Sequence, residues 1–240
     1  AEHLAFGAAG EAPPAPPPLP NAPGPGRRLR VAFLSPDLRA HPVAYFLGPL
    51  LAHLDRASFE IFLYHDHAVV DAMSARLRAG AAQWRNFAGL PAAAVEAVIR
   101  GDAPDVLVDL AGHTGFNRLP LFARRLAPVQ LTYLGYPDTT GLRSMDYRFA
   151  DAITDPPGEA DAFVTEKLVR FARVGWAYAP PAEAPAPPPP PAAAGGRPVT
   201  FGCFNNFAKV SDATLRGWAG ALAAVPGSRL LLKDRSLTRP

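Results

Sequence analysis

The sequence predicts an α/β protein with a parallel β-sheet, and three features of the chain lead to this fold class. Apolar runs of strand length alternate with segments of helical period from about residue 28 to residue 178. The runs are continuous rather than alternating in polarity, which is typical of strands covered on both faces. Proline-rich stretches flank this pattern and do not interrupt it. A Rossmann-like sheet between two layers of helices satisfies all three features.

The first strand–helix pair shows the pattern most clearly. "LRVAFLS" at 29–35 predicts a buried strand, and Pro42 suits the first turn of the helix that follows. Apolar residues in that helix recur at the i, i+3, i+4 spacing of one face: Val43, Phe46, Leu47, Leu50, Leu51 and Leu54. The later elements are, in order, a strand at 59–65, a helix at 71–80, a weaker strand at 83–89, a helix at 91–101, a strand at 105–112, a short helix at 117–126 and a strand at 129–135.

Prolines divide the chain into four parts. The stretches 12–25 and 179–196 cannot form a helix or a central strand, so we expect them to be extended and mobile. The predicted organisation is a proline-rich tail at 1–27, a main lobe at 28–178, a proline-rich linker at 179–197 and a short block at 198–240. The short block repeats strand, helix and strand once. Since two strands do not make a stable sheet, we expect it to be the start of an incomplete second Rossmann-like lobe.

Composition excludes several classes of protein. The single cysteine, Cys203, rules out an internal disulfide and a multi-cysteine zinc site. No apolar run is long enough to span a membrane, and the first twenty residues lack the features of a secretory leader. The net charge is +3 with scattered arginines, so no basic patch favours nucleic-acid binding. We expect a cytoplasmic protein with no nucleic-acid or membrane partner.

Unusual polar residues follow several predicted strands. Asp37 and His41 come after the first strand. His113 and Thr114 come after the fourth strand, and Tyr136 and Asp138 come after the fifth. Ligands bind outside the carboxyl ends of the strands in an open parallel sheet, so a shared cleft explains these residues together. The alternative is structural: His41 as a helix cap and His113 as part of a glycine turn.

The sequence does not predict a metal site. Neighbouring residues of a strand point to opposite faces, so His65, Asp66 and His67 would not converge on one ion. No acidic D-x-D cluster predicts a metal site either.

Lys209 is the strongest single indication of phosphate binding. It stands just ahead of Ser211 and Asp212, the predicted cap of a helix that starts near residue 213. A helix N-terminus with an ammonium nearby binds phosphate groups. The alternative is a solvated surface lysine. Glycine-rich phosphate loops of the G-x-G-x-x-G or Walker A type are absent from the sequence.

Five motifs in order carry a resemblance to a known family. They are "LRVAFLSPDLRAHPVAYF", "DVLVDLAGHTGFNRL", "APVQLTYLGYPDTTG", "MDYRFAD" and "FGCFNNFAKVSD". From about residue 28 to its end, the chain resembles the catalytic region of the O-linked N-acetylglucosaminyltransferases, glycosyltransferase family 41, in their bacterial and SPINDLY-like form. The resemblance implies a GT-B fold, in which two Rossmann-like lobes face each other across a cleft. It also implies an inverting transfer of N-acetylglucosamine from UDP-GlcNAc to serine or threonine hydroxyls of proteins, without metal or cofactor.

The resemblance assigns roles to individual residues. His41, in the "HP" motif, lies beside the sugar and the acceptor, and Lys209, in the "FNxxxK" motif, meets the diphosphate. Asn206 approaches the nucleotide at a position where many animal members have Gln, and we group Asp37 and Ser211 with the donor-binding residues. His113, Thr114, Tyr136 and Pro137 line the cleft.

Two departures and two alternatives accompany this hypothesis. Family members usually carry tetratricopeptide repeats ahead of the catalytic region, and this chain ends at Pro240, ahead of most of the nucleotide-holding second lobe. We therefore expect a fragment of the enzyme. One alternative is a SPINDLY-like protein O-fucosyltransferase that uses GDP-fucose. The other is a non-catalytic binding module, if the natural chain ends at residue 240.

Overall fold

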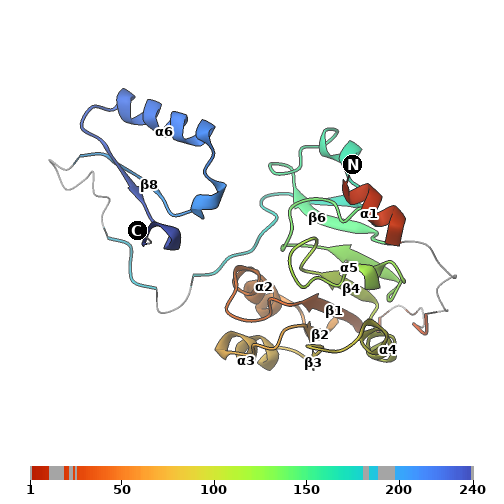
Figure 1. The fold of residues 1–240 in the computed structure, drawn as a ribbon. Coiled ribbons are helices and arrows are strands. Elements are labelled where there is room, and N and C mark those ends of the chain that lie inside the picture. The colour runs from red at the N-terminus through yellow and green to blue at the C-terminus, as the bar shows by residue number, and fades with distance from the viewer. Residues whose placement is uncertain are drawn as a thin grey trace. The chain divides into compact units, whose positions relative to one another are not determined.

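The computed structural model describes residues 2–10, 19–21, 24, 26–180, 184–188 and 198–238. The chain divides into two compact units, Ala1–Pro180 and Pro181–Pro240 (Figure 1). Most of the two proline-rich stretches expected to be extended, 12–25 and 179–196, lies outside the described residues.

Unit 1 is built on a seven-stranded sheet in which every neighbouring pair is parallel. The spatial order is β3-β2-β1-β4-β5-β6-β7. The strands are β1 (Leu29–Ser35), β2 (Phe59–His65), β3 (Gln83–Asn86), β4 (Val106–Asp109), β5 (Val129–Thr132), β6 (Tyr147–Asp151) and β7 (Lys167–Phe171). The first five confirm the predicted strands. β6 and β7 extend the sheet beyond the prediction.

Helices cover both faces of this sheet, because successive side chains of a strand point to opposite sides. Phe33 of β1 packs with α2 (Pro42–His53) and α3 (Ala72–Ala79) on one face. Leu34 packs with α4 (Ala92–Asp102) and α5 (Leu119–Phe122) on the other. A short 3₁₀ helix, η1 (Ala160–Phe163), precedes β7. No helix among the described residues has the length and apolar character needed to cross a membrane.

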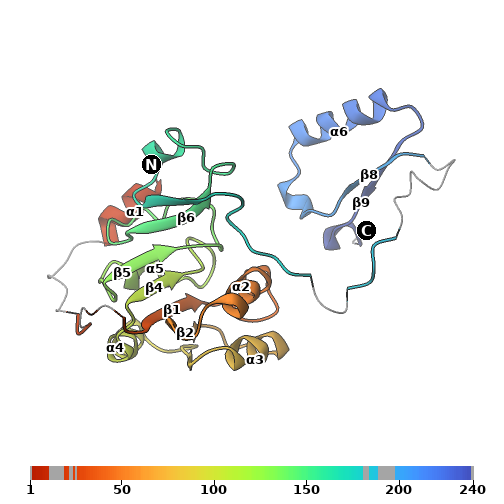
Figure 2. The same ribbon diagram turned by 180° about the vertical axis from the view of Figure 1, so that it is seen from behind.

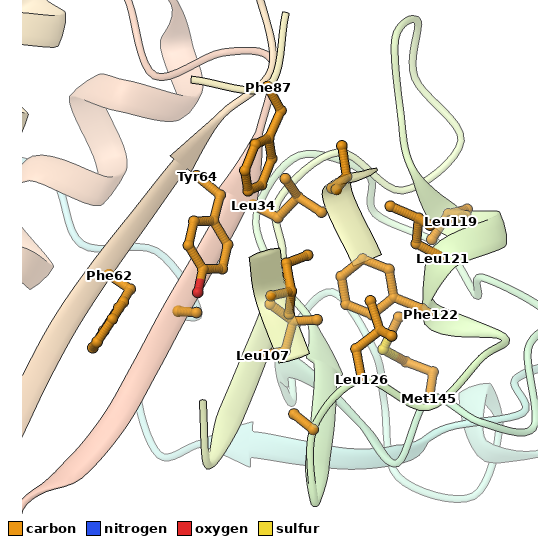
Figure 3. Packing of buried hydrophobic residues seen from close by; sticks show 14 of the residues in the cluster. Leu34, Phe62, Tyr64, Phe87, Leu107, Leu119, Leu121, Phe122, Leu126 and Met145 are labelled. Atoms are coloured by element: carbon orange, nitrogen blue, oxygen red, sulfur yellow. The ribbon is translucent and has the colours of Figure 1, made fainter. Parts of the chain in front are cut away.

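The core on the α4–α5 face is dominated by large apolar side chains (Figure 3). Tyr64, Phe87 and Phe122 are almost completely buried there. Leu107 and Leu126 lie in the same cluster. Burial of this kind stabilises the fold by about 1.5–3 kcal/mol for each large side chain, which gives the loops at the sheet edges a rigid support.

The amino-terminal region corrects one expectation. Residues 1–27 were expected to form a tail, but Glu2–Gly10 form the helix α1. Its inward face carries His3, Phe6 and Gly7, at the i, i+3, i+4 spacing, and Phe6 packs against the main core cluster. Both views of the ribbon place α1 beside the part of the sheet that carries β5 and β6 (Figures 1 and 2). α1 is thus a component of unit 1.

Unit 2 contains one β-α-β repeat, as predicted. Strands β8 (Thr200–Cys203) and β9 (Arg229–Leu232) pair in parallel, and α6 (Asp212–Ala224) connects them. Short 3₁₀ helices, η3 (Phe207–Lys209) and η4 (Arg235–Thr238), follow the two strands. No side chain described in this unit is buried.

Candidate functional site

The predicted site residues of unit 1 follow strands β1, β4 and β5, which lie side by side in the sheet. The chain runs outward from β1 to β2 and β3, then returns to place β4 on the other side of β1. The loops after β1 and β4 therefore diverge at a topological switch point, the position where open α/β sheets bind ligands. Asp37 and His41 follow β1, and His113 and Thr114 follow β4.

His41 is the N-cap of α2. Its backbone is extended, and its Nδ1 accepts a hydrogen bond from the backbone N–H of Val43 at 3.3 Å. The Asp37 Oδ2 atom lies 3.6 Å from the same nitrogen, while Arg39 donates to Asp37 Oδ1 at 3.1 Å. Because Nδ1 accepts, the neutral imidazole carries its proton on Nε2. The structural alternative for His41, a helix cap, is confirmed, and Nε2 takes no part in the cap.

His113 is fixed by a chain of hydrogen bonds that begins at a buried carboxylate. Glu166, just ahead of β7, accepts from the hydroxyls of Thr139 and Thr140 and from the Thr140 backbone N–H at 2.7 Å. The Thr140 carbonyl accepts from His113 Nε2 at 2.9 Å. Since Nε2 donates, Nδ1 of His113 is left with a free lone pair. Glu166 and Thr139 are 27 residues apart in sequence, so no local pattern predicts this support.

Tyr136 packs directly over the turn that carries His113. Gly112 has φ of +53°, and a Cβ added to it would lie 2.3 Å from the Cβ of Tyr136. The rings of His113 and Tyr136 have centroids 5.5 Å apart. The hydroxyl of Thr114 is used within the same turn, where it donates to the Ala111 carbonyl at 2.8 Å. Thr114 therefore shapes the turn with its side chain, whereas His113 and Tyr136 lie together.

Asp109, the last residue of β4, holds this turn by hydrogen bonds to its backbone. Its carboxylate accepts from the backbone N–H groups of Ala111 at 3.1 Å and Gly112 at 2.8 Å, and from the Thr132 hydroxyl at 2.7 Å. Burial raises the pKa of Asp109 above its usual range, against the lowering effect of these donors. Asp109 was not among the predicted site residues, although a carboxylate at the end of the apolar run of β4 is visible in the sequence.

Two hollows open at this edge of the sheet. The larger, of about 400 Å³, follows β2, β3 and β4 and is lined by Asp66, His67, Ala68, Ala88, Gly89, Phe116, Asn117 and Arg118. The smaller, of about 120 Å³, lies beside Tyr136 and Pro137. The buried Arg148 pairs there with Asp155 and donates to the Pro137 carbonyl at 3.5 Å. Pro137 thus contributes a backbone oxygen to the lining of the second hollow.

The predicted residues of unit 2 lie in one loop and helix start. Asn206 caps η3 by accepting from the Ala208 N–H at 3.0 Å, and Ser211 caps α6 by accepting from the Thr214 N–H at 3.3 Å. Lys209 is exposed between these two caps. The structure brings Asn206, Lys209 and Ser211 together within unit 2, and it brings the six predicted residues of unit 1 to one edge of the main sheet.

Comparisons with known proteins identify the family of the chain. The profile of glycosyl transferase family 41 matches residues 19–175. The chain belongs to glycosyl transferase family 41. A probable UDP-N-acetylglucosamine–peptide N-acetylglucosaminyltransferase SPINDLY of Solanum lycopersicum is 42% identical over 221 residues, which cover 89% of this chain and 23% of that protein. The corresponding SPINDLY protein of Arabidopsis thaliana is 39% identical over 217 residues, which cover 89% of this chain and 24% of that protein.

The structure of an O-GlcNAc transferase matches nearly the whole chain. A mutant of the Thermobaculum terrenum O-GlcNAc transferase superimposes with a TM-score of 0.91 at 39% identity, covering 99% of this chain and 45% of that one. The predicted resemblance is confirmed, as is the fold class of a GT-B type, Rossmann-like lobe. The chain spans about a quarter of the length of the curated relatives it matches.

Proposed function

We propose that this chain is the donor- and acceptor-facing part of a cytoplasmic family 41 glycosyltransferase. It acts in the inverting transfer of N-acetylglucosamine from UDP-GlcNAc to serine or threonine hydroxyls of proteins, with no metal or cofactor. Family membership over most of the chain supports a sugar transfer. The observation that carries the proposal is an exposed Lys209 just ahead of the Ser211-capped N-terminus of α6, a combination that suits a phosphate group.

The chemistry follows from where charge develops. The acceptor hydroxyl attacks the anomeric carbon, the bond to the diphosphate breaks, and the electron pair leaves with UDP. The hydroxyl proton passes to the departing diphosphate or to solvent. Lys209 and the free N–H groups of α6 stabilise this negative charge more strongly in the transition state than in the donor. Asn206 contacts the nucleotide, and His41 orients the acceptor or the sugar through its free Nε2. His113, Tyr136 and Pro137 line the cleft.

A side-by-side donor assay tests the choice of sugar. The full-length gene product is incubated with UDP-GlcNAc or GDP-fucose and a protein acceptor, and the released nucleotide and the labelled acceptor are measured. We expect transfer from UDP-GlcNAc. Transfer from GDP-fucose alone would identify a protein O-fucosyltransferase instead, and transfer from neither would leave a binding module.

Replacement of Lys209 tests the phosphate site. Lys209→Ala removes the ammonium, so UDP affinity measured by calorimetry should fall, and turnover should fall further because charge on the leaving group grows in the transition state. Lys209→Arg should restore only part of the loss, since a planar guanidinium replaces a compact point charge. Lys167→Ala is the matched control, because Lys167 is an exposed lysine at the amino end of β7. Unchanged UDP affinity and turnover in Lys209→Ala would show a solvated surface lysine.

A further inference from the structure

α1 is held against unit 1 by a close backbone contact that only glycine permits. A Cβ added to Gly7 would lie 1.8 Å from the Gly141 carbonyl oxygen, and a Cβ added to Gly141 would lie 1.9 Å from the His3 carbonyl oxygen. Gly141 also has φ of +76°, a conformation that disfavours other residues. Gly10, on the same helix, has open space at its Cβ position. The helix is therefore seated by its Gly7 side on the loop that follows β5.

This seating brings His3 onto the loops that carry the predicted cleft residues. His3 Nε2 lies 3.0 Å from the hydroxyl of Tyr136, and its Nδ1 lies 3.9 Å from Asp138 Oδ2. Its ring centroid is 4.5 Å from that of His113. Phe6, one turn along α1, meets the same His113 ring edge-on at 4.9 Å. α1 thus covers both loops at once.

The imidazole of His3 has a hydroxyl on one side and a carboxylate on the other. When the proton is on Nδ1, Nε2 accepts the hydroxyl proton of Tyr136, and the negative charge of Asp138, 3.9 Å from Nδ1, favours this tautomer. The phenol oxygen then keeps its lone pairs for a hydroxyl group that enters the cleft. Asp138, His3 and Tyr136 lie in series, and within this series the hydrogen bond joins the imidazole to the Tyr136 hydroxyl.

We infer that α1 is part of the transfer site and that His3 is a positioning residue, which turns the Tyr136 phenol oxygen toward a hydroxyl of the bound substrates. This inference rests on the proposed function. The group recognised is a hydroxyl, which belongs either to the transferred sugar or to the acceptor side chain. Hydrolysis of the donor by water needs only the sugar in place, whereas transfer needs the sugar and the acceptor. The rates of hydrolysis and transfer therefore distinguish a sugar hydroxyl from an acceptor hydroxyl.

Substitutions of glycine test whether α1 must be seated. In the full-length gene product, Gly7→Ala places a methyl group on the Gly141 carbonyl and should lower the turnover of transfer about 100-fold, the scale of a misplaced reacting group. Gly10→Ala makes the same chemical change in open space and should stay close to wild type. Hydrogen exchange at residues 136–142 should rise in Gly7→Ala only. Equal turnover in the two variants would overturn the role of α1.

Substitutions of His3 test the positioning role. His3→Ala should lower kcat about 10- to 100-fold and change KM for the donor little. His3→Gln sets an amide near the position of Nε2 and should restore part of kcat, whereas His3→Asn sets it near Nδ1 and should not. Loss of donor hydrolysis together with transfer identifies a sugar hydroxyl, and loss of transfer alone identifies an acceptor hydroxyl.

The outcomes of these experiments distinguish a failure of this inference from a failure of the proposed function. A wild-type protein that transfers sugar while His3→Ala transfers equally well contradicts only the inference. The same holds if Gln, Asn and Ala lose activity equally and in step with a lowered Tm, since His3 then serves stability alone. A wild-type protein that transfers from neither donor contradicts the proposed function, and the inference falls with it.

Discussion

His41 serves the fold and the proposed site through different atoms of one ring. Its Nδ1 caps α2, and Asp37 lies on the same side at 3.6 Å. Nε2 takes no part in the cap. The sequence left the structural and the functional role open as alternatives, and the geometry is compatible with both at once. A substitution that keeps the cap and removes Nε2 separates them.

His41→Asn is that substitution, because Asn is among the best N-cap residues and its side-chain oxygen replaces Nδ1 as the acceptor. We expect its Tm to match wild type while turnover in the full-length protein falls about 100-fold. His41→Ala should lose the same activity and, in addition, about 1 kcal/mol of stability. Thermal unfolding and initial rates measured on both variants check this. Wild-type turnover in His41→Asn would return His41 to a purely structural role.

Asp105 makes the stability of unit 1 depend on pH. Arg27 donates to both of its oxygens at 2.6 Å, and hydrogen bonds to this guanidinium are the main reason that the pKa of Asp105 falls to about 2. The unfolded value is about 3.9, so the carboxylate stabilises the fold fully above the unfolded pKa and loses this effect as pH falls from about 4 to 2. Arg27 is half-exposed, so solvent screens its attraction for Asp105. We therefore expect the Asp105 carboxylate to contribute on the order of 1–2 kcal/mol to the free energy of unfolding.

The Asp105→Asn variant measures this contribution. Urea unfolding of wild type and variant should differ by a constant free energy above about pH 5, and the difference should shrink toward pH 2 as the wild-type carboxylate is protonated. A difference that stays the same down to the lowest pH at which both proteins fold would show that the charge of Asp105 does not stabilise unit 1.

Single residues were predictable where the contact is local in sequence. The caps at His41 and Ser211 bond to backbone groups two and three residues ahead, so position within a strand–helix pattern predicted them. His3 and Tyr136 are 133 residues apart, and Thr139 and Glu166 are 27 apart. Such partners are set by strand order and loop path, which no local pattern contains.

At the scale of elements, the prediction succeeded where apolar runs were long and continuous. β6 was missed because Arg148 and Asp151 interrupt its hydropathy, although both are buried. Their charges are compensated by tertiary contacts: Arg148 pairs with Asp155, and Asp151 accepts from the Gly175 N–H at 2.7 Å. The motif containing β6 was noticed only through its family resemblance, because buried ion pairs hide a strand from a hydropathy argument.

α1 was missed for a different reason. Its sequence, "EHLAFGAAG", is rich in glycine and alanine and has a weak apolar face. Helices of this length gain their stability from packing rather than from propensity. The packing here depends on Gly7 meeting Gly141, a contact between distant segments. A glycine that weakens an isolated helix is the residue that lets this one approach unit 1.

At the scale of the whole molecule, the two units differ in how much apolar side-chain surface they bury. The sheet of unit 1 has a buried apolar cluster on each face. Unit 2 pairs two strands and one helix, and none of its described side chains is buried: Leu215 of α6 is 45% exposed and Leu231 of β9 is 53% exposed. A two-stranded sheet with one helix lacks the buried surface to offset the entropy of ordering the chain.

We therefore expect the two units to behave differently when they are produced separately. A fragment of residues 1–180 should unfold in one cooperative transition, with amide protons of β1 and β4 exchanging most slowly, because these neighbouring strands lie between both core clusters. A fragment of residues 181–240 should show little ordered circular dichroism and no cooperative transition. A cooperative melt of the second fragment would mean that β8, α6 and β9 suffice as a folding unit. If that melt is absent, the loop of Lys209 is ordered only by further contacts, and calorimetry with UDP on the fragment should then detect no binding.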